Sequence, residues 1–198
     1  MRWGRLALGI LTVVTVTVGW QGPAGAFEFS ADRVMKEPGR VVGARVNARD
    51  DRWRLEYDVP QEGAMAAIVR PDRGLTWLIM SQRRVYLEVP LTPQHRLLVA
   101  EAMEGEVGRE LIGREDLHGH ACELFEVTTM VHALPRRFYQ WVTSGQRFAL
   151  KTVSKDEGWS LEYRNLRFVS QADRLFEPPY GFSSDKPLGT GKQGAGTP

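Results

Sequence analysis

The feature that most constrains this chain is the alternation of apolar and charged residues in short runs. From Arg52 to Val59, every odd position is apolar and every even position is charged. A period of two sends successive side chains to opposite faces of a strand, so this strand should have one buried face and one solvated face. Similar β-prone runs recur between turn residues along the chain, which is typical of an all-β domain.

The predicted strands cover residues 27–37, 41–48, 52–59, 64–70, 75–80, 84–89, 109–117, 120–131, 138–143, 147–154 and 158–169. In the last of them, the apolar phase changes from odd positions, ending at Tyr163, to even positions at Leu166 and Phe168. This change indicates a β-bulge near Arg164 and Asn165. Residues 132–139 are ambiguous and fit a short helical turn as well as a strand.

One helix is expected between the strands. Thr92 suits the N-cap, Pro93 the first helical position and Gly105 the end of the helix. An apolar stripe at spacings of three and four residues comprises His95, Leu98, Val99, Ala102 and Met103. The run 75–80 is apolar on both faces apart from one threonine, and such a strand needs cover on both sides. We therefore expect a helix over residues 92–104 to cover the sheet.

The start of the chain has the features of a secretory signal peptide. Arg2 and Arg5 precede an apolar run of about 13 residues, and Ala24-Gly25-Ala26 offers the small residues that a signal peptidase needs. A membrane-spanning helix needs about 20 apolar residues, so a permanent membrane anchor is the weaker interpretation.

Three regions follow from this organisation. Residues 1–26 are a cleaved signal peptide, residues 27–182 form one β domain, and residues 183–198 form a tail. The tail consists mainly of Gly, Ser, Thr, Lys and Pro and cannot bury enough apolar surface to become ordered. The expected location is the periplasm.

Composition excludes several classes of partner. Without Arg2 and Arg5 the chain has 24 basic and 24 acidic residues. This balance lacks the excess of Lys and Arg found in nucleic-acid-binding proteins, and it gives no electrostatic attraction to an anionic membrane. Cys122 is the only cysteine, so the domain has no internal disulfide and must be held together by packing. The sequence does not define an oligomeric state.

Several motifs together resemble the periplasmic lipoprotein-carrier superfamily (LolA/LolB-like), and in particular an uncharacterised branch of small exported proteins. The motifs lie at residues 29–36, 52–56, 68–74 with Trp77 and Met80, 119–127, and 175–182. The resemblance implies a strongly curved, incomplete antiparallel β-barrel with one amphipathic helix across its mouth. It also implies a cavity similar to the apolar acyl-chain pocket of the carriers. It transfers no individual ligand-binding residue to this chain.

Catalytic and metal-binding motifs are weak or missing in the sequence. His118, His120 and Cys122 alternate, so in an extended strand they could share a face and bind a metal. No further His or carboxylate lies at an obvious ligand spacing, and a free Cys is often a small buried hydrophobe. The core interpretation is therefore favoured, with no metal and no cofactor. The sequence has no G-x-S-x-G elbow, P-loop or dinucleotide fingerprint, which predicts that the protein is not an enzyme.

The functional prediction rests on the aromatic and methionine residues. The candidate lining of an apolar cavity is Trp53, Trp77, Met80, Leu98, Val99, Met103 and Trp141. Flexible Met and flat aromatic side chains suit a surface that adapts to a lipid chain, although the same residues can fill a solid core. Two functions stay open. One is a non-enzymatic binding or carrier domain for an apolar ligand, with a lipid or an acylated protein as its partner. The other is a cell-envelope protein-interaction or sensing domain with a filled core.

The signal-peptide interpretation predicts that the exported protein begins at Phe27. The intact mass of exported material should match residues 27–198. A membrane-bound product that retains residues 1–26 would contradict the prediction.

Overall fold

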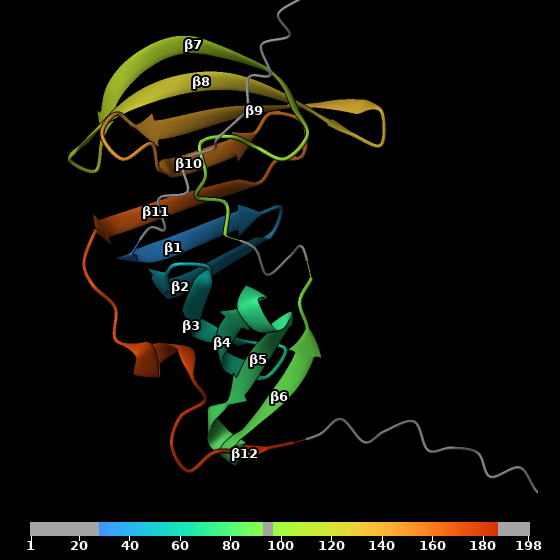
Figure 1. The fold of residues 1–198 in the computed structure, drawn as a ribbon. Helices are drawn as coiled ribbons and strands as arrows, with labels where there is room; N and C mark the ends of the chain where they lie inside the picture. The colour runs from blue at the N-terminus through green and yellow to red at the C-terminus, as the bar shows by residue number, and fades with distance from the viewer. Residues whose placement is uncertain (1–27, 93–96, 186–198) are drawn as a thin grey trace, which may run out of the picture.

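A computed structural model describes residues 28–92 and 97–185, which form one strongly curled twelve-stranded sheet (Figure 1). The strands are β1 (Phe29–Glu37), β2 (Arg40–Arg49), β3 (Arg52–Gln61), β4 (Ala64–Arg70), β5 (Leu75–Met80), β6 (Val85–Pro90), β7 (Glu106–Leu117), β8 (His120–Val131), β9 (Leu134–Thr143), β10 (Ala149–Ser154), β11 (Ser160–Arg167) and β12 (Ser183–Ser184). The predicted all-β class and the open, curved, barrel-like sheet are confirmed.

The order of the strands is β12-β6-β5-β4-β3-β2-β1-β11-β10-β9-β8-β7. The chain winds outward from β1 to β6, starts again at the opposite edge with β7, and returns to the centre, where β11 pairs with β1. Every pair is antiparallel except the short β12, which runs parallel to β6. Strand β12 lies just past the predicted domain boundary at residue 182. Residues 1–27 and 186–198, which hold the expected signal peptide and most of the expected tail, lie outside the described residues.

The predicted bulge is present between β1 and β11. Ser30 lies opposite Arg167 whereas Asp32 lies opposite Arg164, so β11 has one extra residue in this interval. Asn165 takes up the difference with a φ of 51°. The ambiguous residues 132–139 form no helical turn, because β9 already begins at Leu134.

One face of the sheet, here called the inner face, carries the main apolar core. Val46 of β2 lies opposite Ala31 of β1 on one side and Leu55 of β3 on the other, so the three side chains project from the same side. The buried members of this core are Phe29, Ala31, Ala44, Val46, Ala48, Leu55, Ala67, Cys122, Phe148, Leu150, Leu161, Tyr163 and Leu166. Its centre is a set of edge-to-face contacts in which the ring of Phe148 lies 5.0 Å from that of Phe29 and 5.4 Å from that of Tyr163.

The opposite face of β4 and β5 is apolar as well, and the C-terminal segment covers it. Ala66, Ile68, Trp77 and Ile79 form a second cluster with Phe176, which has no exposed surface. A single 3-10 turn, η4 (Asp173–Phe176), places Phe176 over the strands. The run 75–80 is thus covered on this face, as predicted, but by the C-terminal segment.

The prediction of a helix over residues 92–104 is wrong for residues 97–104, which the structure describes. Residues 97–104 are not helical, and residues 93–96 lie outside the described residues. Burial alternates strictly from Leu97 to Glu104, as in an extended chain. An isolated helix of about 12 residues is marginal in water, and here the extended segment gains a backbone hydrogen bond from the sheet, from the Ala149 amide to the Val99 carbonyl at 2.9 Å. The stripe at 98, 99, 102 and 103 fitted a helical period by coincidence. Within the described residues, no helix has the length and hydropathy of a membrane span.

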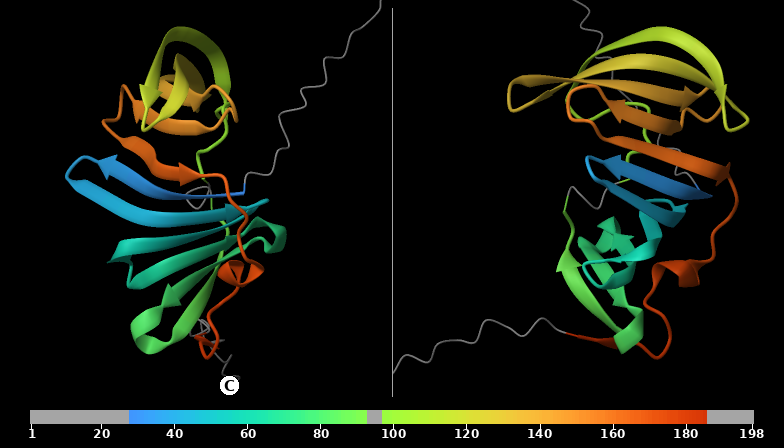
Figure 2. Two further views of the ribbon diagram at one scale, coloured as in Figure 1. Left: turned by 90° about the vertical axis from the view of Figure 1, so that its left-hand side faces the viewer. Right: turned by 180° about the vertical axis from the view of Figure 1, so that it is seen from behind.

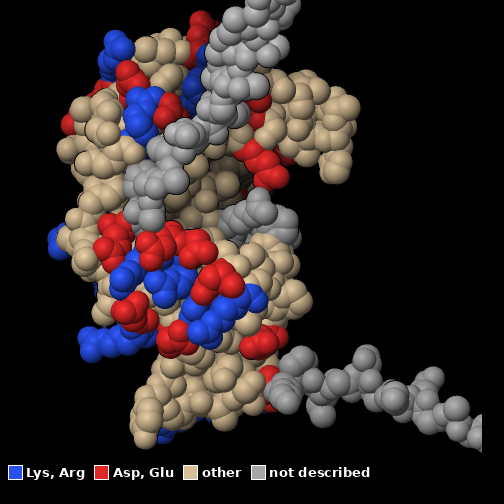
Figure 3. Space-filling view, viewed as in Figure 1, with Lys and Arg blue, Asp and Glu red and all other residues tan. Residues whose placement is uncertain are grey.

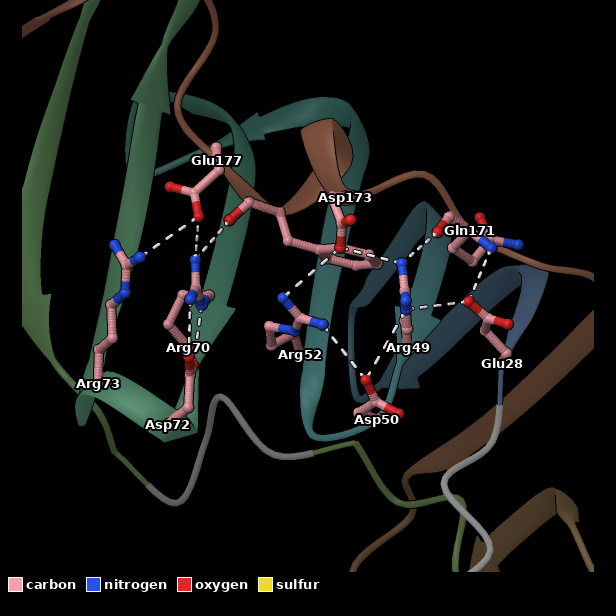
Figure 4. Close-up of polar contacts among 11 residues, drawn as sticks. Glu28, Arg49, Asp50, Arg52, Arg70, Asp72, Arg73, Gln171, Asp173 and Glu177 are labelled. Atoms are coloured by element: carbon pink, nitrogen blue, oxygen red, sulfur yellow. Dashed lines mark hydrogen bonds and ion pairs between the residues drawn. The ribbon is translucent and has the colours of Figure 1, made fainter.

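A charged band fastens the C-terminal segment to the sheet (Figures 3 and 4). The side chain of Arg70 is only 4% exposed and donates two hydrogen bonds to the Asp72 carboxylate, at 2.8 and 2.7 Å. It also donates to the Phe176 carbonyl at 3.0 Å and to Glu177 at 2.5 Å. Farther along the band, Arg49 bonds Asp173 at 2.9 Å. The guanidinium groups therefore connect β2 and β4 to a segment more than a hundred residues away in the chain.

We predict that Arg70→Lys destabilises the fold far more than Arg73→Lys. The ammonium of a lysine cannot make the two-pronged bond to Asp72 while also reaching Phe176, so we expect a loss of about 2–3 kcal/mol in the free energy of unfolding. Arg73 also contacts Glu177, at 3.5 Å, but its side chain is 47% exposed, and its replacement should cost less than about 0.5 kcal/mol. Urea unfolding measures both values, and equal losses would contradict the role given to Arg70.

Candidate functional site

The candidate site is the recess beside the segment Leu97–Gly105, here called the crossing segment, which packs on the inner face. The sheet curls most strongly at β7 to β10 (Figures 1 and 2), and the crossing segment runs from the β6 side of the sheet to β7. Figure 3 shows a hollow between this curled part and the charged band, with an uncharged visible floor and acidic residues at its rim.

The crossing segment turns alternate side chains toward the sheet. Leu97 and Val99 pack against the main core, and Met103 packs against a smaller cluster. The buried members of that cluster are Phe125, Val127, Phe138 and Val142. Leu98 points away and is 44% exposed. The segment therefore forms one wall of the recess, and every second side chain along it points toward the sheet.

Few backbone contacts hold this wall in place. Besides the bond from Ala149 to Val99, the segment's carbonyls accept from the Gln140 side chain at Ala100 (3.4 Å), from the Arg109 side chain at Glu101 (2.5 Å) and from the Met130 amide at Gly105 (2.8 Å). The Met103 amide donates to the Glu106 carboxylate at 2.9 Å, and the Met103 carbonyl accepts from the Glu106 amide at 3.1 Å. A strand of the same length between two neighbours would make a bond at nearly every residue. The segment is thus hydrogen-bonded to its surroundings at some residues only, and it is not a strand of the sheet.

An ion cluster adds to these attachments. Arg147 donates to Glu101 of the crossing segment, with Nε 2.9 Å from Oε2, and to Glu123 of β8 at 2.5 Å. The Phe125 ring lies between Arg109, at 4.8 Å, and Arg147, at 5.7 Å. The hydrogen bonds from Arg147 lower the pKa values of Glu101 and Glu123 below their usual value. Arg147 has a φ of 57°, a strained conformation for a residue with a side chain.

The structure distributes the seven expected lining residues over several places. Trp53 and Val99 are half-buried against the main core, Met103 packs on the smaller cluster, and Met80 ends β5 beside Gly63. Trp141 is half-buried, with the Lys151 ammonium 4.7 Å from its ring. Trp77 is 5% exposed on the opposite face, under Phe176, and Leu98 faces outward. Trp53, Val99 and Met103 are therefore placed on the inner side, and Met80 shares this side by its strand phase with Leu78.

The His118, His120 and Cys122 run is divided by a turn. His118 has a φ of 56° between β7 and β8, and its Nε2 lies 2.6 Å from Oε1 of Glu162. Cys122 is 2% exposed, and burial raises the pKa of its thiol. Within residues 28–92 and 97–185, no three His, Cys, Asp or Glu side chains converge where a metal could be held. The burial agrees with Cys122 as a core residue.

Sequence reasoning missed a group of buried polar atoms. Within the described part of the chain, four such side-chain atoms have no hydrogen-bond partner: Arg33 Nε, Arg109 Nη1, Gln140 Oε1 and the Tyr163 hydroxyl. The strand register places all four side chains in phase with the inner face. One signal was available, because Arg33 stands between Ala31 and Met35 in the apolar phase of β1.

Comparison with known proteins shows similarity in fold and not in sequence. No protein-family model matches the chain, and no curated protein matches it. The MucA/MucB complex of Pseudomonas aeruginosa is 14% identical over 76% of this chain and 55% of the other, with a TM-score of 0.51. A second structure of MucB in complex with MucA(peri) is 14% identical over 78% of this chain and 55% of the other, with a TM-score of 0.52. The lipoprotein LppX of Mycobacterium tuberculosis is 14% identical over 75% of this chain and 91% of the other, with a TM-score of 0.43.

The two MucB comparisons show a similar fold and no more. This chain spans just over half the length of the MucB chain that it matches. Membership of the lipoprotein-carrier superfamily, and of one small exported branch within it, stays a prediction.

We predict that Glu101→Gln loosens the crossing segment. A half-exposed ion pair contributes about 1 kcal/mol, so hydrogen-exchange protection of the Ala149 amide should fall roughly fivefold. Because Arg147 lowers the pKa of Glu101, the contribution is present above the usual carboxylate pKa and is lost as the pH falls through the lowered value. The difference between the variant and the wild type should therefore vanish in acid.

Glu126→Gln is the matched control for this measurement. Glu126 lies on β8 and pairs with Lys155 at 3.0 Å, with similar exposure, but within the described residues neither partner bonds to the crossing segment. Its replacement should leave the protection of the Ala149 amide unchanged. An equal loss in both variants would mean that the Glu101 pair does not hold the segment.

Proposed function

We propose that this protein is a non-enzymatic periplasmic binding or carrier domain for an apolar ligand such as a lipid or an acyl chain. The observation that carries the proposal is the recess, which has an apolar inner face, a wall attached at a few points, and unpartnered polar atoms. Ligand sites commonly combine an apolar lining with a few convergent polar groups. Apolar side chains on or near the inner face that remain partly exposed include Met35, Trp53, Tyr57, Leu78, Val99 and Phe168.

The crossing segment would act as the movable wall. Elements that open are expected to have fewer buried contacts and fewer backbone bonds than the strands beneath them. The crossing segment meets this description, because side-chain contacts and an exposed ion cluster provide much of its attachment. Binding would then need only local separation of this wall, without disruption of the sheet.

Val99→Ala and Leu98→Ala test the wall directly. Val99 faces the recess and Leu98 faces outward, although they are neighbours in the chain. The loss of two methyl groups from a ligand contact should weaken binding of a fluorescent fatty acid about tenfold. Leu98→Ala should leave the affinity unchanged. Fluorescence titration measures both, and the absence of binding by the wild type would contradict the proposal.

Native mass spectrometry gives an independent test. Protein purified from the periplasm of its own cell should carry a co-purifying lipid mass. Repeated preparations of ligand-free protein would favour the second function.

That second function is a cell-envelope protein-interaction domain, and a projecting hairpin favours it. The β8–β9 hairpin extends beyond the body of the sheet and presents an uncharged tip (Figures 1 and 3). Its exposed apolar residues are Met130 at 41%, Val131 at 45% and Leu134 at 59%. The MucB structures of similar fold were solved with a protein partner. A Met130→Ser/Leu134→Ser variant separates the two functions, because it should keep fatty-acid binding and lose only a protein bound at the tip.

A further inference from the structure

Arg33 differs from the arginines of the charged band in having no carboxylate partner. Within the described residues, no ion pair joins its guanidinium to an acid, and its Nε is buried without a hydrogen-bond acceptor. A guanidinium carries five N–H donors and no acceptor. A charge held in this state against an apolar face is costly unless something else pairs with it.

Two tyrosines share a row with Arg33. Arg33 of β1 lies opposite Tyr163 of β11 on one side and Ala44 of β2 on the other. Ala44 in turn lies opposite Tyr57 of β3. Directly opposed residues project from the same face, so Tyr163, Arg33, Ala44 and Tyr57 form one row across the inner face. Ala44, between Arg33 and Tyr57 in this row, has a small side chain that is 3% exposed.

The groups in this row are donors. Tyr163 has no exposed surface, and burial raises its pKa to about 12, so its hydroxyl keeps its proton at neutral pH. That hydroxyl makes no hydrogen bond of normal geometry within the described residues, and the nearby Arg33 guanidinium offsets part of the rise in its pKa. Burial also raises the pKa of Tyr57. A guanidinium and two protonated phenols together require an acceptor with several lone pairs, which is the chemistry of a carboxylate or a phosphate.

The row reaches the surface at Arg33 and Tyr57, which are both half-buried. A groove of about 550 Å³ touches Arg33, Ala44 and Tyr57 at the point where the pairing of β2 with β3 ends. Most of its other lining residues lie in the opposite strand phase, so the groove runs mainly along the other face of the sheet. Three acids also line this groove, and all three lie in the opposite strand phase. Asp32 accepts a hydrogen bond from Asn165 at 2.7 Å, Glu56 accepts one from Arg54 at 2.8 Å, and Asp58 lies against Gly43. Glu62 is a further carboxylate whose charge acts on Tyr57. None of the four forms an ion pair with Arg33 in the described structure.

We propose that Arg33, Tyr57 and Tyr163 form an anion subsite, which binds the carboxylate or phosphate of an amphipathic ligand whose chain lies along the inner face. The inference rests on the proposed function and adds the class of ligand to it. The subsite would position the polar end, and the apolar core would bind the chain.

Calorimetric titration of the full exported chain with three single-chain probes tests the subsite. The probes are dodecanoate, dodecyl phosphate and dodecanol, each used below its aggregation concentration. The wild type should bind at least one of the two anions about tenfold more tightly than the alcohol. Preference for dodecanoate indicates a fatty-acid carboxylate, and preference for dodecyl phosphate indicates a phospholipid-type headgroup.

Arg33→Gln should remove this preference and leave the affinity for dodecanol unchanged. Arg45→Gln is the matched control, because Arg45 is on the neighbouring strand in the opposite phase, with a side chain 69% exposed. It should retain the preference. Equal binding of all three probes by the wild type, or an equal loss for all three in Arg33→Gln, overturns the subsite and leaves the apolar site intact. Failure of the wild type to bind any probe overturns the proposed function itself.

Tyr163→Phe provides a second variant in case Arg33→Gln does not fold. It removes a buried donor that has no partner, so the melting temperature of the ligand-free protein should rise or stay the same. The affinity for the preferred anion should fall about fivefold, with no change for dodecanol. A lower melting temperature together with unchanged binding of the anion would assign the hydroxyl a structural role and overturn its place in the subsite.

Discussion

The pairing of β1 with β11 is the interaction on which the rest of the structure depends. Strands β1 to β6 and β7 to β11 are two runs of neighbouring antiparallel strands, and this one seam makes them a single sheet. Phe29, Phe148 and Tyr163 contact one another across the seam through their ring edges. Without the seam, the inner face would be divided and the crossing segment would have no continuous surface to span. The polar row proposed as an anion subsite also crosses it.

A sheet with apolar residues on both faces must be covered on both. The two segments that cover this sheet are attached to it with different strength. On the face of β4 and β5 that bears Trp77, the C-terminal segment is held by Phe176 and by the buried guanidinium of Arg70. On the inner face, the crossing segment is held by a few hydrogen bonds and by partly exposed ion pairs. The difference in attachment makes the first cover part of the fold and makes the second suitable for opening. The same difference explains why the inner face is the better candidate for a ligand.

The inner face is chemically unusual for a plain core. Buried polar groups are normally hydrogen-bonded, because an unmade bond costs about 1–3 kcal/mol. Four such atoms lie on one apolar face, and a bound partner that made the missing hydrogen bonds would offset this cost. Donors predominate near the seam, at Arg33 and Tyr163, whereas Gln140 supplies an acceptor under the crossing segment. An amphipathic ligand would satisfy such a surface better than a hydrocarbon would.

The sequence by itself predicted the eleven longer strands, β1 to β11, because alternation with a period of two is a local property of each run. It even located the bulge at Asn165, where a change of phase is visible without any partner strand. It also identified Cys122 as a core residue.

The tertiary structure alone decided the state of residues 97–104, the cover over Trp77 and which side chains lie beside Arg33. In each case the deciding contact joins residues far apart in the chain, such as Ala149 with Val99, Phe176 with Trp77, and Tyr163 with Arg33. A stripe such as Leu98, Val99, Ala102 and Met103 fits a helix when taken alone, but the hydrogen bonds and apolar surface of a distant strand outweigh a weak local preference.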